Sequence, residues 1–110
     1  MDTWDIRSLD VQPHSPRVLR SDKEARLIAI HLPAGEELQE HQVHERAYLL
    51  VADGEIEVEG GGENVTGGPG FLAHFDPNER HEVRAKSDAR LMLILGPWPG
   101  EGHPSHRAAG

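Results

Sequence analysis

The chain contains no cysteine among its 110 residues. This absence excludes disulfides, thiolate metal sites such as zinc fingers, and a cysteine nucleophile. Any functional site therefore has to be built from histidine, carboxylate and hydroxyl side chains. A chain of this length buries a single core and has no room for a separate binding domain, so we expect one domain with one site.

Basic residues are also scarce, with 11 Lys and Arg against 19 Asp and Glu and a net charge of −8. Such a surface repels phosphate backbones and anionic lipids, which argues against nucleic acid or a membrane as a partner. No apolar run approaches the roughly 20 residues that span a bilayer, and the N-terminal MDTWDIRSLD lacks the features of a signal peptide. These features predict a cytoplasmic protein.

Apolar and polar residues alternate with a period of two along most of the chain, which is typical of half-buried strands. Asp53-Gly54 predicts a hairpin turn, and further hairpin connections are expected at residues 22–24 and 86–88. No segment shows a convincing helical period. The pattern predicts an all-β protein with strands at 25–32, 46–51, 55–59, 71–75, 81–85 and 90–96.

The two ends of the chain differ from this central part. Residues 1–24 contain the strand-like segments WDIRSL and RVLRS, whereas residues 97–110 are rich in Pro and Gly and predict a mobile tail. We therefore expect an N-terminal strand-like segment, a β-barrel at 25–96 and a C-terminal tail. Because small β-sheet domains must cover their edges, we also expect a homodimer in which an N-terminal strand or Trp98 reaches the partner.

The segment LPAGEELQEHQVHERAYLLVADGEIEVEG resembles the first sequence motif of the cupin family, in which a glycine precedes His-x-His, a Glu and a second glycine. Gly35, His41 and Gly54 occupy matching positions. The family's second His falls on Val43 and its Glu on Ala47. Two of the four metal ligands that the resemblance implies are therefore apolar in this chain.

The segment GGPGFLAHFDPNERHEV resembles the second cupin motif, with Gly70, Pro77 and His81 in matching positions. Asn78 replaces a turn glycine and also tolerates positive φ. The resemblance implies a cupin-type antiparallel β-barrel or double-sheet jelly roll of the RmlC-like kind, in which His41 and His81 are the inherited ligands. With the strand pattern it predicts that the buried positions include Ile56, Val58, Leu72, Leu91 and Leu93.

Three further side chains are candidates to complete a site with His41 and His81. His44 joins His41 only if the chain bends or bulges between them, and a surface position is the alternative. Glu45 would complete a set of two histidines and one carboxylate, and His74 is a further cavity candidate. We expect the metal ligands to be His41, His44 and His81, with Glu45 and His74 as additional cavity residues.

Imidazole ligands suit a divalent metal without distinguishing among Zn, Ni, Fe, Cu and Mn. Our first hypothesis is a protein that binds a small molecule in the barrel cavity, with or without a divalent metal. A metal-dependent oxygenase or isomerase is one alternative, and a metal-free scaffold with a vestigial pocket is another. Whether the protein is an enzyme stays open, although no nucleophile with an adjacent base supports hydrolase chemistry.

Overall fold

The period-two alternation produces strands and no helix in the part of the chain that the structure describes. The computed structural model describes residues 1–41 and 44–97, with the backbone alone described at 39–41. Val43 lies outside these residues, and so do Trp98 and the rest of the predicted C-terminal tail. The strands are β1 Arg17–Ser21, β2 Arg26–Leu32, β3 Glu37–His41, β4 Arg46–Asp53, β5 Ile56–Gly60, β6 Glu63–Gly67, β7 Leu72–Phe75, β8 His81–Ala85 and β9 Ala89–Gly96.

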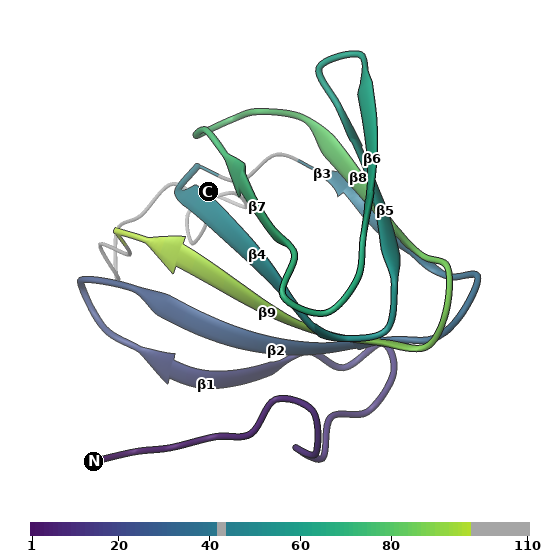
Figure 1. Cartoon of the computed structure of the whole chain (residues 1–110). Helices are drawn as coiled ribbons and strands as arrows, with labels where there is room; N and C mark the ends of the chain where they lie inside the picture. The colour runs from purple at the N-terminus through teal and green to yellow at the C-terminus, as the bar shows by residue number, and fades with distance from the viewer. Residues whose placement is uncertain (42–43, 98–110) are drawn as a thin grey trace.

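The strands form two antiparallel sheets that pack face to face (Figure 1). One sheet has five strands in the order β1-β2-β9-β4-β7, and the other has four in the order β3-β8-β5-β6. The sheets do not close into a barrel, so the predicted all-β fold is confirmed in its double-sheet, jelly-roll form. Among the described residues no helix is long and apolar enough to cross a membrane, and the cytoplasmic location stays a prediction.

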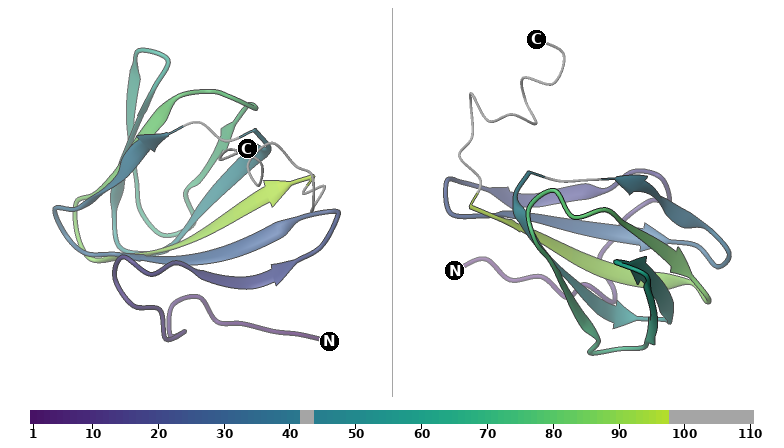
Figure 2. Two further views of the ribbon diagram at one scale, coloured as in Figure 1. Left: turned by 180° about the vertical axis from the view of Figure 1, so that it is seen from behind. Right: turned by 90° about the horizontal axis from the view of Figure 1, so that it is seen from above.

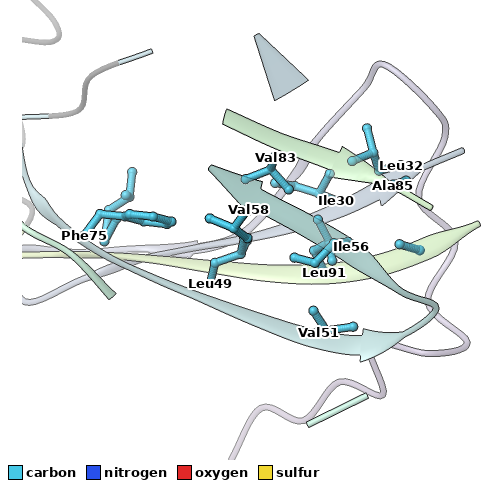
Figure 3. Close-up of a cluster of buried hydrophobic side chains, with 13 residues drawn as sticks. Ile30, Leu32, Leu49, Val51, Ile56, Val58, Phe75, Val83, Ala85 and Leu91 are labelled. Carbon is cyan, nitrogen blue, oxygen red and sulfur yellow. The ribbon is translucent and has the colours of Figure 1, made fainter. Parts of the chain in front are cut away.

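Alternate residues of both sheets point inward and form one apolar core between them (Figure 3). The predicted burial is confirmed for Ile56, Val58 and Leu91, and Leu93 packs against the same cluster. The prediction is wrong for Leu72, which is 59% exposed. Phe75 occupies an inward position on β7, and residues an odd number of positions apart on a strand face opposite sides of a sheet, so Leu72 faces outward.

Truncating a valine of this core should destabilise the protein far more than truncating an exposed valine. Val51 is 1% exposed and Val65 is 44% exposed. Val51→Ala removes buried methyl groups and leaves a cavity, so we expect a loss of about 2–3 kcal/mol of unfolding free energy. Val65→Ala should cost less than about 0.5 kcal/mol, because its methyl groups are already hydrated. Urea unfolding followed by circular dichroism measures both, and equal losses would contradict the placement of the core.

The Asp53-Gly54 turn joins β4 to β5, which lie in different sheets and do not pair. The hairpin predicted there is therefore wrong, and so is the one at residues 86–88, which connect β8 to β9. Both segments are crossovers between the sheets. They lie against each other, because a Cβ added at Gly54 would collide with the backbone carbonyl oxygen of Asp88. Gly54 also has φ +83°, a conformation that side chains disfavour.

The connection at residues 22–24 is a hairpin, as predicted, and joins β1 to β2. The carboxylate of Asp22 accepts hydrogen bonds from the backbone N–H groups of Glu24 and Ala25 at 3.0 and 3.1 Å. The side-chain hydrogen bond from Arg20 and these backbone bonds hold the pKa of that carboxyl below its ordinary value. The turn is therefore closed by an ionised side chain near neutral pH.

A second hairpin, which the sequence pattern missed, joins β5 to β6. Its two loop residues, Gly61 and Gly62, have φ +59° and +82° and so provide the mirror-image turn that tight hairpins prefer. Strand β6 escaped detection because four of its five residues are exposed and show no apolar alternation.

The N-terminal segment, residues 1–16, runs along the outside of β1 and β2 (Figure 2). The strand expected at WDIRSL is absent, because the N–H groups of Ser8 and Leu9 both bond the carbonyl of Asp5 in a turn. The segment is attached to the sheet at two points. His31 Nδ1 lies 3.1 Å from the carbonyl oxygen of Val11, and Arg90 donates to the carbonyl of Leu9 at 2.9 Å.

Candidate ligand site at the His81 end

The register of β3 against β8 places the backbone of His41 directly opposite His81. Leu38 pairs with Val83, and a bulge between Leu38 and His41 inserts one residue. Without it, position 40 would stand opposite His81, so the bulge decides which residue reaches this place. The side chain of His41 lies outside the described part of the chain, as does the bend predicted between His41 and His44.

His81 is 4% exposed and belongs to the inward face of β8. Its ring stacks on Phe75 of the opposite sheet, with centroids 3.8 Å apart and an angle of 6° between the ring planes. We call this end of the sandwich, where β3 and β7 end and β4 and β8 begin, the His81 end. The stack joins the two sheets there and holds the imidazole in place.

The backbone carbonyl of Glu79 determines which ring nitrogen of His81 carries hydrogen. His81 Nδ1 lies 3.2 Å from that oxygen. A carbonyl only accepts hydrogen bonds, so Nδ1 is the donor and the neutral ring carries its lone pair on Nε2. His81 therefore presents Nε2 as its acceptor or ligand atom.

Gly60 occupies the place beside His81 on the other neighbouring strand, β5. A Cβ there would lie 3.3 Å from the carbonyl oxygen of Arg80 and 3.5 Å from the Cβ of His81. Because this position has no side chain, His81 borders an opening of about 160 Å³. The lining comprises Glu59, Gly60, Gly61, Gly62, Arg80, His81 and Glu82, and two of these, Glu59 and Glu82, also belong to an acidic cluster on the outer face of the four-stranded sheet. The run of three glycines at 60–62 is the sequence feature that could have indicated this opening, although no motif of ligand residues accompanies it.

The first residues of β4 contribute from the five-stranded sheet. Ala47 is buried and pairs with Phe75, so the position that the cupin motif gives to a Glu carries only a methyl group. Glu45 is 3% exposed and lies two residues earlier, immediately before β4 begins. His44 is exposed. Because Glu45 is buried and His44 is exposed, Glu45 is the better candidate for a site residue at the His81 end.

His74 is not a cavity residue, contrary to the expectation from the sequence. It lies on the outer face of β7, where Arg46 Nη1 is 2.8 Å from its Nε2 and the ring of Tyr48 is 5.2 Å away. The cause is the alternation that turns Phe75 inward. Among the side chains that the structure describes, no three His, Asp or Glu gather in a group that could hold a metal ion. The side chain of His41 is not one of them.

The ion pair between Arg84 and Glu37 lies on the outer surface and does not line the opening beside His81. On the outer face of the four-stranded sheet, the side-chain hydrogen bond to Glu37 raises the pKa of Arg84. The two side chains approach to 3.1 Å. This pair crosses from β3 to β8 and stabilises the outer surface of the sheet without contributing to the opening beside His81.

The fold and this end together define a double-sheet jelly roll with an opening beside a buried histidine. Residues 28–96 match the model of the cupin domain family, and the chain belongs to this family. This finding confirms the resemblance seen in the two sequence motifs. No curated protein matches the chain significantly.

Several solved structures superpose closely on the chain, and the first two of those that follow are described as cupins. A cupin-2 domain protein from Shewanella frigidimarina has 22% identity and a TM-score of 0.70, covering 84% of this chain and 89% of its own. An RmlC-like cupin from Desulfovibrio desulfuricans has 19% identity and a TM-score of 0.78, with coverage of 88% and 97%. KdgF from Halomonas sp. has 20% identity and a TM-score of 0.71, with coverage of 82% and 86%. At these identities the likeness concerns the fold alone.

Proposed function

We propose that the protein binds a small molecule at the His81 end, with a divalent metal ion held by His41, His81 and Glu45 as its anchor. The observation that carries the proposal is the buried imidazole of His81, held in a single tautomer by Glu79 and stacked on Phe75, in a residue that also lines an opening. The opening of about 160 Å³ is smaller than the roughly 300–1,000 Å³ of typical drug-sized sites. A small ligand is therefore the better fit.

The chemistry of His81 fits a metal ligand. Histidines that bind metals commonly donate their other ring N–H to a backbone carbonyl, which orients the ring. His81 makes this bond to Glu79. Glu45 is buried just before β4 and could supply a carboxylate oxygen as a further ligand. Two imidazoles and one carboxylate would leave open positions for water or a ligand oxygen.

A metal at this place would polarise an oxygen atom of the bound molecule. The chain's own residues would bind and orient that molecule. Phe75 excludes water from one face of the His81 ring, and the lining of the opening, which carries Arg80 together with Glu59 and Glu82, suits a polar molecule. In the metal-free alternative the small molecule would hydrogen-bond His81 and Arg80 directly.

Metal titration of the chelator-stripped protein tests the proposal. We expect one Zn²⁺, Ni²⁺ or Fe²⁺ per chain near neutral pH, with affinity about tenfold weaker at about pH 5.5, because protons compete for the imidazole nitrogens. Calorimetry and elemental analysis measure both. Absence of binding would refute the metal site. A thermal-shift screen of small acids, phenols and sugars on the metal-free protein would then test ligand binding alone.

Single substitutions of Glu45 and of His44, in two separate variants, should identify the third metal ligand. Glu45→Gln keeps the shape of the side chain but removes its charge, and we expect it to weaken metal binding about tenfold or more. His44→Gln should leave the affinity within about twofold, since its side chain is exposed. The opposite result would return His44 to the ligand set that the sequence predicted.

A further inference from the structure

Arg26 is the first residue of β2, which begins at the His81 end because β2 runs in the same direction as β4. The register pairs Arg26 with Leu95, Leu95 with Ala47, and Ala47 with Phe75. The last three residues belong to the core cluster. Residues that pair across a ladder lie on the same face of a sheet, so the Arg26 side chain leaves β2 on the inner face. Arg26 is half-buried, and its Nε is inaccessible to solvent.

An arginine on the inner face of an apolar sandwich is uncommon. Among the lysines and arginines of the described strands, Arg26 alone pairs with a core residue, whereas Arg46, Arg84 and Arg90 lie on outer faces. The net charge of −8 repels anions from most of the surface. An anion that enters the space between the sheets therefore finds its favourable electrostatic partner at Arg26.

The inner face beside Arg26 is apolar and only partly covered. Ile28 lies two positions further along β2 and pairs with Leu93 of β9 and with Val18 of β1. Ile28 and Leu93 pack against the core but are only half-buried, and Val18 is 45% exposed. Leu49 continues the same row toward β7 and is 1% exposed. Solvent thus reaches an apolar strip on the β1 side of the row, next to the guanidinium.

We propose that the small molecule bound at the His81 end is a monocarboxylate with an apolar body, and that Arg26 binds its carboxylate. A guanidinium donates two parallel N–H bonds to a carboxylate. The body of the acid lies over Ile28 and Leu93, where it removes apolar surface from water. One arginine balances one negative charge, so a dianion such as a phosphate monoester fits this face less well.

This inference rests on the proposed function, since it names the class of molecule that the same end binds. Benzoate and benzamide test the class directly, because they share their shape and differ in charge. We expect the unmodified, chelator-stripped protein to bind benzoate about tenfold or more tightly than benzamide, because only benzoate forms charge-assisted hydrogen bonds with Arg26. Calorimetric titration or ligand-observed NMR measures both affinities, first without metal and then with saturating Zn²⁺.

Three variants assign the binding to one side chain. Arg26→Gln should weaken benzoate binding about tenfold or more and leave benzamide binding unchanged. Arg26→Lys keeps the charge but loses the fork of donors, so its benzoate affinity should fall between the two. Arg84→Gln is the matched control, because it changes the net charge equally on the outer face, where Arg84 contacts Glu37. It should bind benzoate within about twofold of the unmodified protein.

Absence of benzoate binding, or equal affinities for benzoate and benzamide, would overturn the inference and needs no variant that folds. Benzoate binding that a folded Arg26→Gln variant retains in full would also overturn it. Benzoate binding that requires Zn²⁺ and His81 but not Arg26 would assign the carboxylate to the metal and overturn it too. Conversely, a protein that binds benzoate through Arg26 but takes up no metal would support this inference and refute the metal site of the proposed function.

Discussion

His81→Ala is expected to weaken metal binding by about a hundredfold or more, the largest functional effect of any single substitution in the chain. The change removes Nε2, the ring nitrogen left as the ligand atom by the bond from Nδ1 to the carbonyl of Glu79. It also removes the stack on Phe75. Calorimetric titration with Zn²⁺ or Ni²⁺ measures the loss.

His74→Ala is the matched control for this experiment. It removes the same kind of side chain from the outer face of β7, where His74 contacts Arg46 and Tyr48 and not the His81 end. Its metal affinity should equal that of the unmodified protein. Full metal binding by a folded His81→Ala variant would eliminate His81 as a ligand, and weakened binding by His74→Ala would contradict the assignment of the two faces.

Gly54→Ala is expected to destabilise the fold by roughly 3–4 kcal/mol, about 1 kcal/mol from the positive φ and the rest from overpacking. The new Cβ would meet the backbone of Asp88 and Ala89, which cannot rotate away as a flexible side chain can. Both crossovers between the sheets would have to shift. The midpoint of urea unfolding should therefore fall steeply.

Gly61→Ala separates the two contributions to this loss. Gly61 has φ +59°, but nothing lies within 4 Å of an added Cβ. Only the backbone conformation is penalised there, so the loss should be about 1 kcal/mol. Equal destabilisation by Gly54→Ala and Gly61→Ala would contradict the close approach of Gly54 to the backbone of Asp88 and Ala89.

Much of the fold follows from local patterning. Strict alternation of apolar residues predicted β5 and β8, because one face of each strand is buried between the sheets. Strand β6 was not predictable in this way, since it lies at the edge of its sheet with its side chains largely exposed. The exposure of Leu72 was also beyond local reasoning, because an apolar residue on an outer face has the same sequence signature as one in the core.

The candidate site was predictable only in part. The motif spacing singled out His41 and His81, and the register of β3 against β8 places their backbones opposite each other. The spacing could not rank Glu45 above His44, because that order depends on which residue the entry into β4 buries. The sequence reasoning also predicted that His74 lies near the cavity. Side chains alternate along β7, however, and because Phe75 faces inward the adjacent His74 faces outward.

By itself the sequence determined the all-β class, the membership of the cupin family and the histidine of the second motif, because alternation and motif spacing are local properties of the chain. The tertiary structure alone decided that Asp53-Gly54 is a crossover and not a hairpin, that a bulge brings position 41 opposite His81, and that Leu72 lies exposed on an outer face. Each of these depends on which strands become neighbours, and strand pairing is a contact between residues far apart in the sequence.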